Sequence, residues 1–66
     1  MLKYLEELAR DKTKIAVFFS ASAGNKLISA NGVITEVGAD FMVMTDIYGN
    51  IMLIPLAGIA YIEIKK

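Results

Sequence analysis

The chain has 66 residues, 56% of them hydrophobic, and its seven basic and seven acidic side chains leave a formal net charge of zero. It contains no Cys and no His, which excludes disulfides, imidazole-based nucleophile pairs and nearly all structural metal sites, so we expect no enzymatic activity and no cofactor. A single domain of this length, residues 1–66, buries only about 60% of the surface that its unfolded state exposes, and we therefore expect copies of the chain to complete the core by self-association.

Residues 1–11 are predicted to form one amphipathic helix. Apolar side chains recur at helical spacing along this segment, at Met1, Tyr4, Leu5, Leu8 and Ala9. Charged side chains occupy the opposite face. A helix of about three turns is marginal in isolation, so this helix is expected to pack on the rest of the domain.

From residue 15 onward the pattern changes to a period of two, with many β-branched and aromatic residues, which predicts a β domain over residues 14–66. Turn residues divide this segment into five expected strands, at Ile15–Ser20, Lys26–Val37, Phe41–Asp46, Ile51–Leu56 and Ile59–Ile64. A short helix followed by five short strands favours a mostly β fold, a small and strongly bent SH3-like barrel.

The second of these segments has two interpretations. Asn31-Gly32 lies near its middle, and Asn-Gly is the strongest short signal for a two-residue hairpin turn. The alternative is one long strand that bends at Gly32, and we favour the bent strand. Pro55 cannot donate a ladder hydrogen bond, which places it at a sheet edge or a strand end.

Neither an export signal nor a membrane span is expected. The N-terminus has no apolar signal core and no small-residue cleavage site, so we predict a cytoplasmic protein. The longest uncharged run, Ile47 to Ile62, contains Gly49, Asn50, Pro55 and Gly58. A bilayer span takes about 20 predominantly apolar residues, so this run is not expected to cross a membrane.

Two segments of the β domain carry a family resemblance. The first is Gly32-Val33-Ile34-Thr35-Glu36-Val37, a turn and then Phe41-Met42-Val43-Met44, and the second is Ile51 to Ile62. They resemble the first and the second motif of the Sm-like family, which includes the Hfq-like proteins. The resemblance implies an N-terminal helix followed by a five-stranded Sm-like barrel. It also implies cyclic homo-oligomers of about five to seven copies, in which the fourth strand of one copy pairs with the fifth strand of the next.

The resemblance assigns the apolar residues of the last two strands to the interface between copies. These residues are Ile51, Leu53, Ile54, Leu56, Ile59, Tyr61 and Ile62. Unpaired apolar strands with little charge aggregate unless another strand covers them, so closing a ring is physically apt here.

Sm-like rings commonly bind RNA, through an aromatic residue and an Asp/Asn pair near the first motif and a basic pair near the second. With one extra residue in the turn, Phe41 occupies the stacking position of that set, whereas an ungapped alignment places Asp40 there. In the alignment with the extra residue, Val43 stands in the Asn position. Pro55-Leu56 replaces the basic pair. The family's RNA-binding set is therefore not reproduced in this chain.

The charge distribution also disfavours nucleic acid. Residues 27–64 contain no Lys or Arg but carry the acidic side chains of Glu36, Asp40, Asp46 and Glu63, and nucleic-acid affinity depends on cations. We expect no DNA binding, and we place any RNA contact on a basic rim of Lys12, Lys14 and Lys26. The sequence thus favours a non-enzymatic Sm-like scaffold or protein-interaction module, with an RNA-binding riboregulator that has an atypical site as the alternative.

Overall fold

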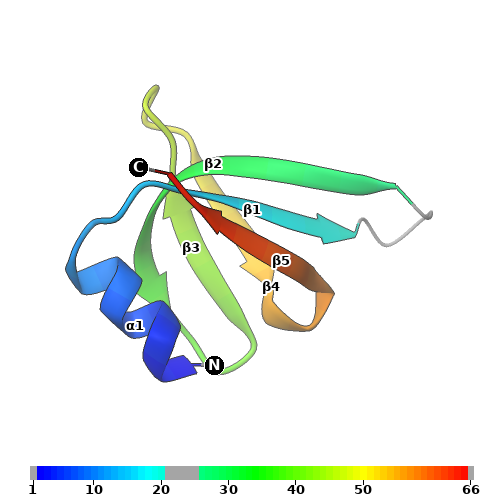
Figure 1. Cartoon of the computed structure of the whole chain (residues 1–66), viewed down its shortest axis with the longest axis horizontal. Helices are drawn as coiled ribbons and strands as arrows, with labels where there is room; N and C mark the ends of the chain where they lie inside the picture. Colours follow the sequence, from blue (N-terminus) through cyan, green and yellow to red (C-terminus); the bar gives the residue numbers. More distant parts are fainter. Residues whose placement is uncertain (1, 21–25, 66) are drawn as a thin grey trace.

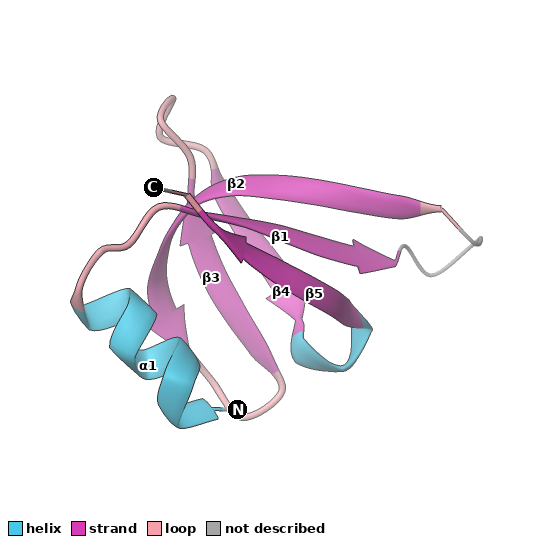
Figure 2. Ribbon diagram, viewed as in Figure 1, coloured by secondary structure: helices cyan, strands magenta, loops and turns pink. Residues whose placement is uncertain are grey.

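The computed structural model of the chain describes residues 2–20 and 26–65, so the turn expected over residues 22–25 lies outside the described residues. One helix precedes five strands, as Figure 2 shows. In chain order the elements are α1 (Leu2–Arg10), β1 (Ile15–Ser20), β2 (Leu27–Val37), β3 (Phe41–Thr45), β4 (Ile51–Pro55), the short 3-10 turn η1 (Leu56–Gly58) and β5 (Ile59–Ile64). The prediction of a mostly β chain with an N-terminal helix is confirmed. Nowhere in these two ranges is there a helix long and apolar enough to cross a bilayer.

Helix α1 packs on the sheet through a narrower stripe than the periodicity predicts. Leu5 and Leu8 are buried against the core, whereas Tyr4 stays exposed. The helix ends at Arg10. Two residues further on, Lys12 has a φ of 51°, in the left-handed region, and the backbone N–H of Thr13 donates to the carbonyl of Leu8 at 3.1 Å. This arrangement satisfies carbonyl groups at the helix end and turns the chain toward β1.

Strand β2 is one long strand that bends in its middle, so the hairpin interpretation of Asn31-Gly32 is wrong. Up to Gly32 the strand pairs with β1, with Ile15 opposite Gly32. From Val33 onward it pairs with β3, with Val33 opposite Thr45. The bend therefore lies where the strand changes partner, and the two halves of the sheet fold toward each other about this point (Figure 1).

The sheet is entirely antiparallel, with the strand order β4-β3-β2-β1-β5. No ladder joins β4 to β5, so the expected bent barrel is not closed in the single chain. The four Cα steps from Pro55 to Ile59 hold the two edge strands within about 15 Å of each other at one end. Turn η1 crosses this end of the sheet, and β5 then pairs with the edge of β1 that faces away from β2. The curled sheet is therefore open between β4 and β5. Pro55 is the last residue of the edge strand β4, as its missing N–H requires.

The core lies between the two halves of the folded sheet and beneath α1. Its buried members are Leu5, Leu8, Ile15, Val17, Ala30, Ile34, Met42, Met44 and Ile54. Met42 and Met44 are completely buried, so these methionines of β3 belong to the interior. The described core is small, and no polar side chain is buried within it.

Candidate interaction surface

The two edge strands of the sheet, β4 and β5, are the first candidate surface, because the outer edge of each has unpaired backbone groups. Strand β4 has the sequence Ile-Met-Leu-Ile-Pro and carries no charge, and β5 has the sequence Ile-Ala-Tyr-Ile-Glu-Ile with the single charge of Glu63. Natural edge strands are usually short, charged, bulged or covered, to prevent pairing with other chains. Strand β4 has Pro55 at its end, and β5 has Glu63 and an irregularity in its pairing with β1, so both edges are only lightly protected.

The seven residues predicted for an interface divide into three groups. The side chains of Ile51, Leu53 and Tyr61 are 72%, 68% and 49% exposed, respectively. The side chains of Leu56, Ile59 and Ile62 are partly buried against the core. Ile54 is completely buried within the core, because its side chain points to the opposite face from its neighbour Leu53, so only its backbone lies at the edge.

Two exposed apolar residues lie at the tip of the β3–β4 hairpin: Tyr48, which its place at a turn tip predicts to be an exposed aromatic, and Ile47, which sequence reasoning missed. Ile47 and Tyr48 are 81% and 82% exposed, more than any other large hydrophobic residue that the structure describes. They follow Asp46 and precede Gly49 in a turn, a position where polar residues are usual. An apolar pair inside an otherwise typical turn sequence was the signal that could have identified Ile47.

The side chain of Asp46 organises this turn. Its Oδ1 accepts hydrogen bonds from the backbone N–H groups of Tyr48 and Asn50, both at 2.9 Å. Its Oδ2 accepts a hydrogen bond from Nδ2 of Asn50 at 3.0 Å. Gly49 adopts a φ of 86°, which glycine tolerates without strain. The side-chain hydrogen bond from Asn50, followed by those from the backbone, lowers the pKa of Asp46 below its ordinary value of 3.8.

We expect this carboxylate to make the stability of the fold depend on acid pH. The pKa of Asp46 is lower in the folded than in the unfolded state, so its carboxylate stabilises the fold when the pH is above the unfolded pKa of 3.8. This contribution disappears as the pH falls through the lower pKa of the folded state. Asp46→Asn should therefore melt at a lower temperature than the natural chain near neutral pH, and the two melting temperatures should converge in acid. Circular dichroism melts across the acid range test this, and a constant difference at every pH would contradict it.

The structure separates the four residues predicted to contact RNA. Lys12 and Lys14 lie between α1 and β1, and Phe41 begins β3. Lys26 precedes Leu27, which pairs with Ser20 at the far end of the β1–β2 ladder. At about 3.4 Å per residue, this ladder places Lys26 about 20 Å from Lys14. Within one copy, Lys26 therefore lies at the opposite end of the ladder from Lys12 and Lys14.

Ion pairs and carboxylate clusters are sparse in the described part of the chain. The ion pair between Arg10 and Asp11, with a nitrogen-to-oxygen distance of 3.4 Å, is the only one within residues 2–20 and 26–65, and both side chains are exposed. No three carboxylates come together in these ranges in a way that would hold a metal ion. The exposed apolar residues of the edge strands and the hairpin tip are thus the more prominent surface feature.

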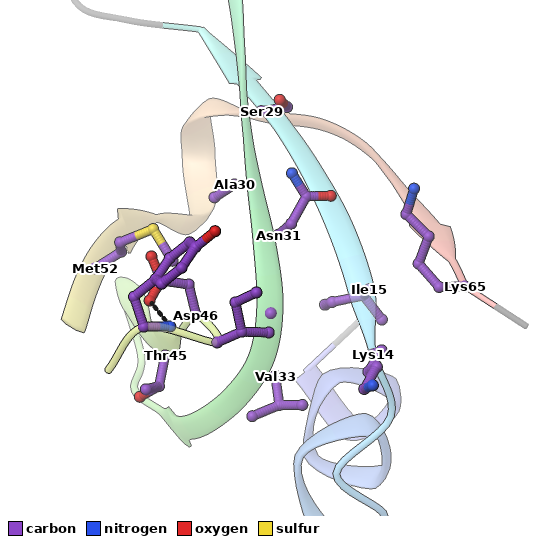
Figure 3. Close-up of a pocket in the computed structure, with 13 residues that line it drawn as sticks. Lys14, Ile15, Ser29, Ala30, Asn31, Val33, Thr45, Asp46, Met52 and Lys65 are labelled. Atoms are coloured by element: carbon purple, nitrogen blue, oxygen red, sulfur yellow. Dashed lines mark hydrogen bonds between the residues drawn. The ribbon is translucent and has the colours of Figure 1, made fainter. Parts of the chain in front are cut away.

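The surface also has a concavity of about 600 Å³ over the bend of β2, drawn in Figure 3. Lys14 and Lys65 lie on one side of β2 in this view, Met52 and Asp46 lie on the other, and Asn31 stands between them. A smaller apolar groove of about 230 Å³ runs between α1 and β5. The larger concavity combines apolar walls with two cationic side chains.

Known proteins provide no further guide to the identity of these surfaces. No known protein family matches the chain, and no curated protein is similar to it. The interpretation of the edges and of the concavity therefore rests on the residues of this chain.

Proposed function

We propose that the protein is a non-catalytic module that associates with copies of itself through β4 and β5 to form a closed Sm-like ring, and that this ring serves as a scaffold or protein-binding platform. The observation that carries the proposal is the pair of free edges. The curled sheet leaves the outer edges of β4 and β5 unpaired, and exposed apolar side chains project from both strands.

The strand order favours a head-to-tail contact. The two edge strands differ in sequence, so the contact between β4 of one copy and β5 of the next joins two different surfaces. Each copy in such an assembly uses its β4 for one neighbour and its β5 for the other. Such heterologous contacts produce a ring when the rotation between copies closes. The strands are also matched in length, with five residues in β4 and six in β5. A ring would remove every free edge and complete the bent barrel between neighbouring copies.

Apolar burial supplies the driving force for this contact. Fully covering a large aliphatic or aromatic side chain contributes about 1.5 to 3 kcal/mol, and Ile51, Leu53 and Tyr61 all have exposed area to lose. A chain without disulfides has few other means to supplement a small core. The interface therefore serves the stability of each copy as well as the assembly.

The charge of the β domain favours a scaffold over an RNA-binding ring. Residues 27–64 contain four acidic and no basic side chains, and a ring would multiply this negative charge by the number of copies. Counterion release from phosphates, which drives most RNA binding, needs clustered cations. The separation of Lys14 from Lys26 weighs in the same direction.

The mass of the protein in solution tests the proposal. For about five to seven copies of the 7.2 kDa chain, light scattering coupled to size exclusion should give about 36 to 50 kDa. The absorbance ratio at 260 and 280 nm on the same peak should show protein alone after nuclease treatment. A 7.2 kDa monomer would contradict the ring, and nucleic acid that stays with the peak would contradict the scaffold and support the RNA-binding alternative.

A further inference from the structure

We propose that the concavity over the bend of β2 binds a small planar organic anion, with its negative group at Lys14 and Lys65 and its apolar ring toward the β3–β4 hairpin. Its volume of about 600 Å³ falls within the range of about 300 to 1,000 Å³ that is typical of small-molecule sites. Such sites combine mostly apolar walls with a few polar groups that orient the ligand. This concavity has both components, contributed by different elements of the fold.

The cationic side is formed where the two ends of the β domain meet. The backbone N–H of Lys65, just after β5, donates to the carbonyl oxygen of Lys14, just before β1, at 2.9 Å. Both lysine side chains are exposed, and neither has a carboxylate within 4.0 Å in the part of the chain that the structure describes. Two cationic side chains that line the same side of the concavity favour an anionic ligand there.

The apolar side comes from the hairpin tip and the strands next to it. Ile47, Tyr48 and Met52 line the concavity together with Val33 of β2. Tyr48 supplies an aromatic surface and Met52 a polarisable thioether, and both pack well against flat rings. A ligand seated here would cover part of the exposed surface of Ile47 and Tyr48, which nothing else in the described chain covers.

Asp46 also borders the concavity, but its carboxylate is engaged within the turn. Both of its oxygens accept hydrogen bonds from the backbone or side chain of residues 48–50. These bonds hold the hairpin tip in place, and a preformed rim reduces the entropy that binding must overcome. Glu63 lies on β5 two residues from Lys65, and it does not line the concavity. The charged lining is therefore two lysines and one internally bonded aspartate, which selects an anion over a cation.

Three ligands of one shape and different charge test the assignment. 2-Naphthoate is the anion, 2-naphthylmethanol is its neutral analogue and 2-naphthylmethylamine is the cation. In a titration of the ¹⁵N-labelled protein followed by NMR, 2-naphthoate should bind saturably, with shifts centred on the amides of residues 14, 29–33, 45–48 and 65. The neutral analogue should bind more weakly, and the cation should bind least.

Variants of the lysines separate a local site from a general charge effect. Lys14→Gln combined with Lys65→Gln should weaken 2-naphthoate binding about five- to tenfold, since each partly exposed charge contact contributes modestly. Lys3→Gln combined with Lys26→Gln removes the same charge elsewhere and should leave the affinity unchanged. Equal affinity for all three ligands, equal loss in both double variants, or shifts centred on β4 and β5 would overturn the proposal. The readout does not depend on the number of copies, so the failure of this site and the failure of the ring are distinguishable.

Discussion

Replacing Gly32 with alanine should destabilise the fold by about 2 to 3 kcal/mol, because the new methyl group has no room. A Cβ atom at this position would collide with the carbonyl oxygen of Thr45 and lie 2.9 Å from its carbonyl carbon and 3.1 Å from Cα of Asp46. These are backbone atoms at the end of β3 and the start of the hairpin turn, which cannot rotate away as a side chain would. The φ of 155° at Gly32 adds strain for any L-residue.

The loss should be large relative to the total stability, which for a chain of this length is about 3 to 10 kcal/mol. A decrease in melting temperature of about 10 to 20 °C is expected. It is measured by circular dichroism at matched protein concentration, because self-association makes the melting temperature depend on concentration.

Gly58→Ala is the matched control for this change. At Gly58 the nearest atoms to a new Cβ are the carbonyl oxygen of Ser20 at 3.5 Å and Cγ of Pro55 at 3.7 Å, which are ordinary contacts. Replacing a glycine whose backbone suits alanine stabilises a fold by about 0.4 to 1 kcal/mol, through the unfolded state. An unchanged melting temperature for Gly32→Ala, or equal losses in both variants, would show that the close approach at the bend is not required.

Replacing Leu53 with lysine should dissociate the proposed ring. Leu53 is 68% exposed on the free edge strand β4 and carries no charge, so the single chain tolerates the change. In the assembly the same position would be covered, and an unpaired ammonium group would replace an apolar contact. We expect a loss of about 3 kcal/mol per interface, a more than hundredfold lower association constant. The measurement is the solution mass over a dilution series.

Leu27→Lys makes the same exchange away from both edges. Leu27 begins β2 opposite Ser20 and is separated from β5 by β1. This variant should keep the mass of the natural protein. If Leu53→Lys keeps that mass and solubility as well, β4 is not the contact surface, and if both variants dissociate, the effect is one of charge rather than of position.

Local patterns in the sequence were sufficient to identify the elements of this fold. The period of 3.6 in α1 and the period of two in the strands reflect which side chains face the core, and turn residues mark where each strand ends. The bounds of β1 and β5 agree with the prediction at both ends. The expected strand ends Asp46 and Leu56 instead belong to the hairpin turn and to η1, because Asp46 bonds to its own turn and Leu56 donates to Asp40.

The candidate surfaces were less predictable, because exposure depends on contacts between distant segments. Ile54 and Leu53 are adjacent apolar residues of one strand, yet one is buried and the other exposed. Which face of β4 turns inward depends on its register with β3, where Val43 lies opposite Leu53. Lys14 and Lys65 meet only because β5 pairs with β1, and their separation of about 50 residues conceals that contact in the sequence.

By itself, the sequence determined the class of fold, the positions of the helix and the strands, and the lack of any Cys or His, since these follow from composition and local periodicity. Only the tertiary structure decided between a bend and a hairpin at Gly32, because both satisfy the local turn chemistry and only the pairing with β1 and β3 differs. Tertiary structure also decided that the sheet stays open. Closure depends on whether β4 and β5 lie within hydrogen-bonding distance of each other, and that is settled by the curvature of the whole sheet rather than by either strand.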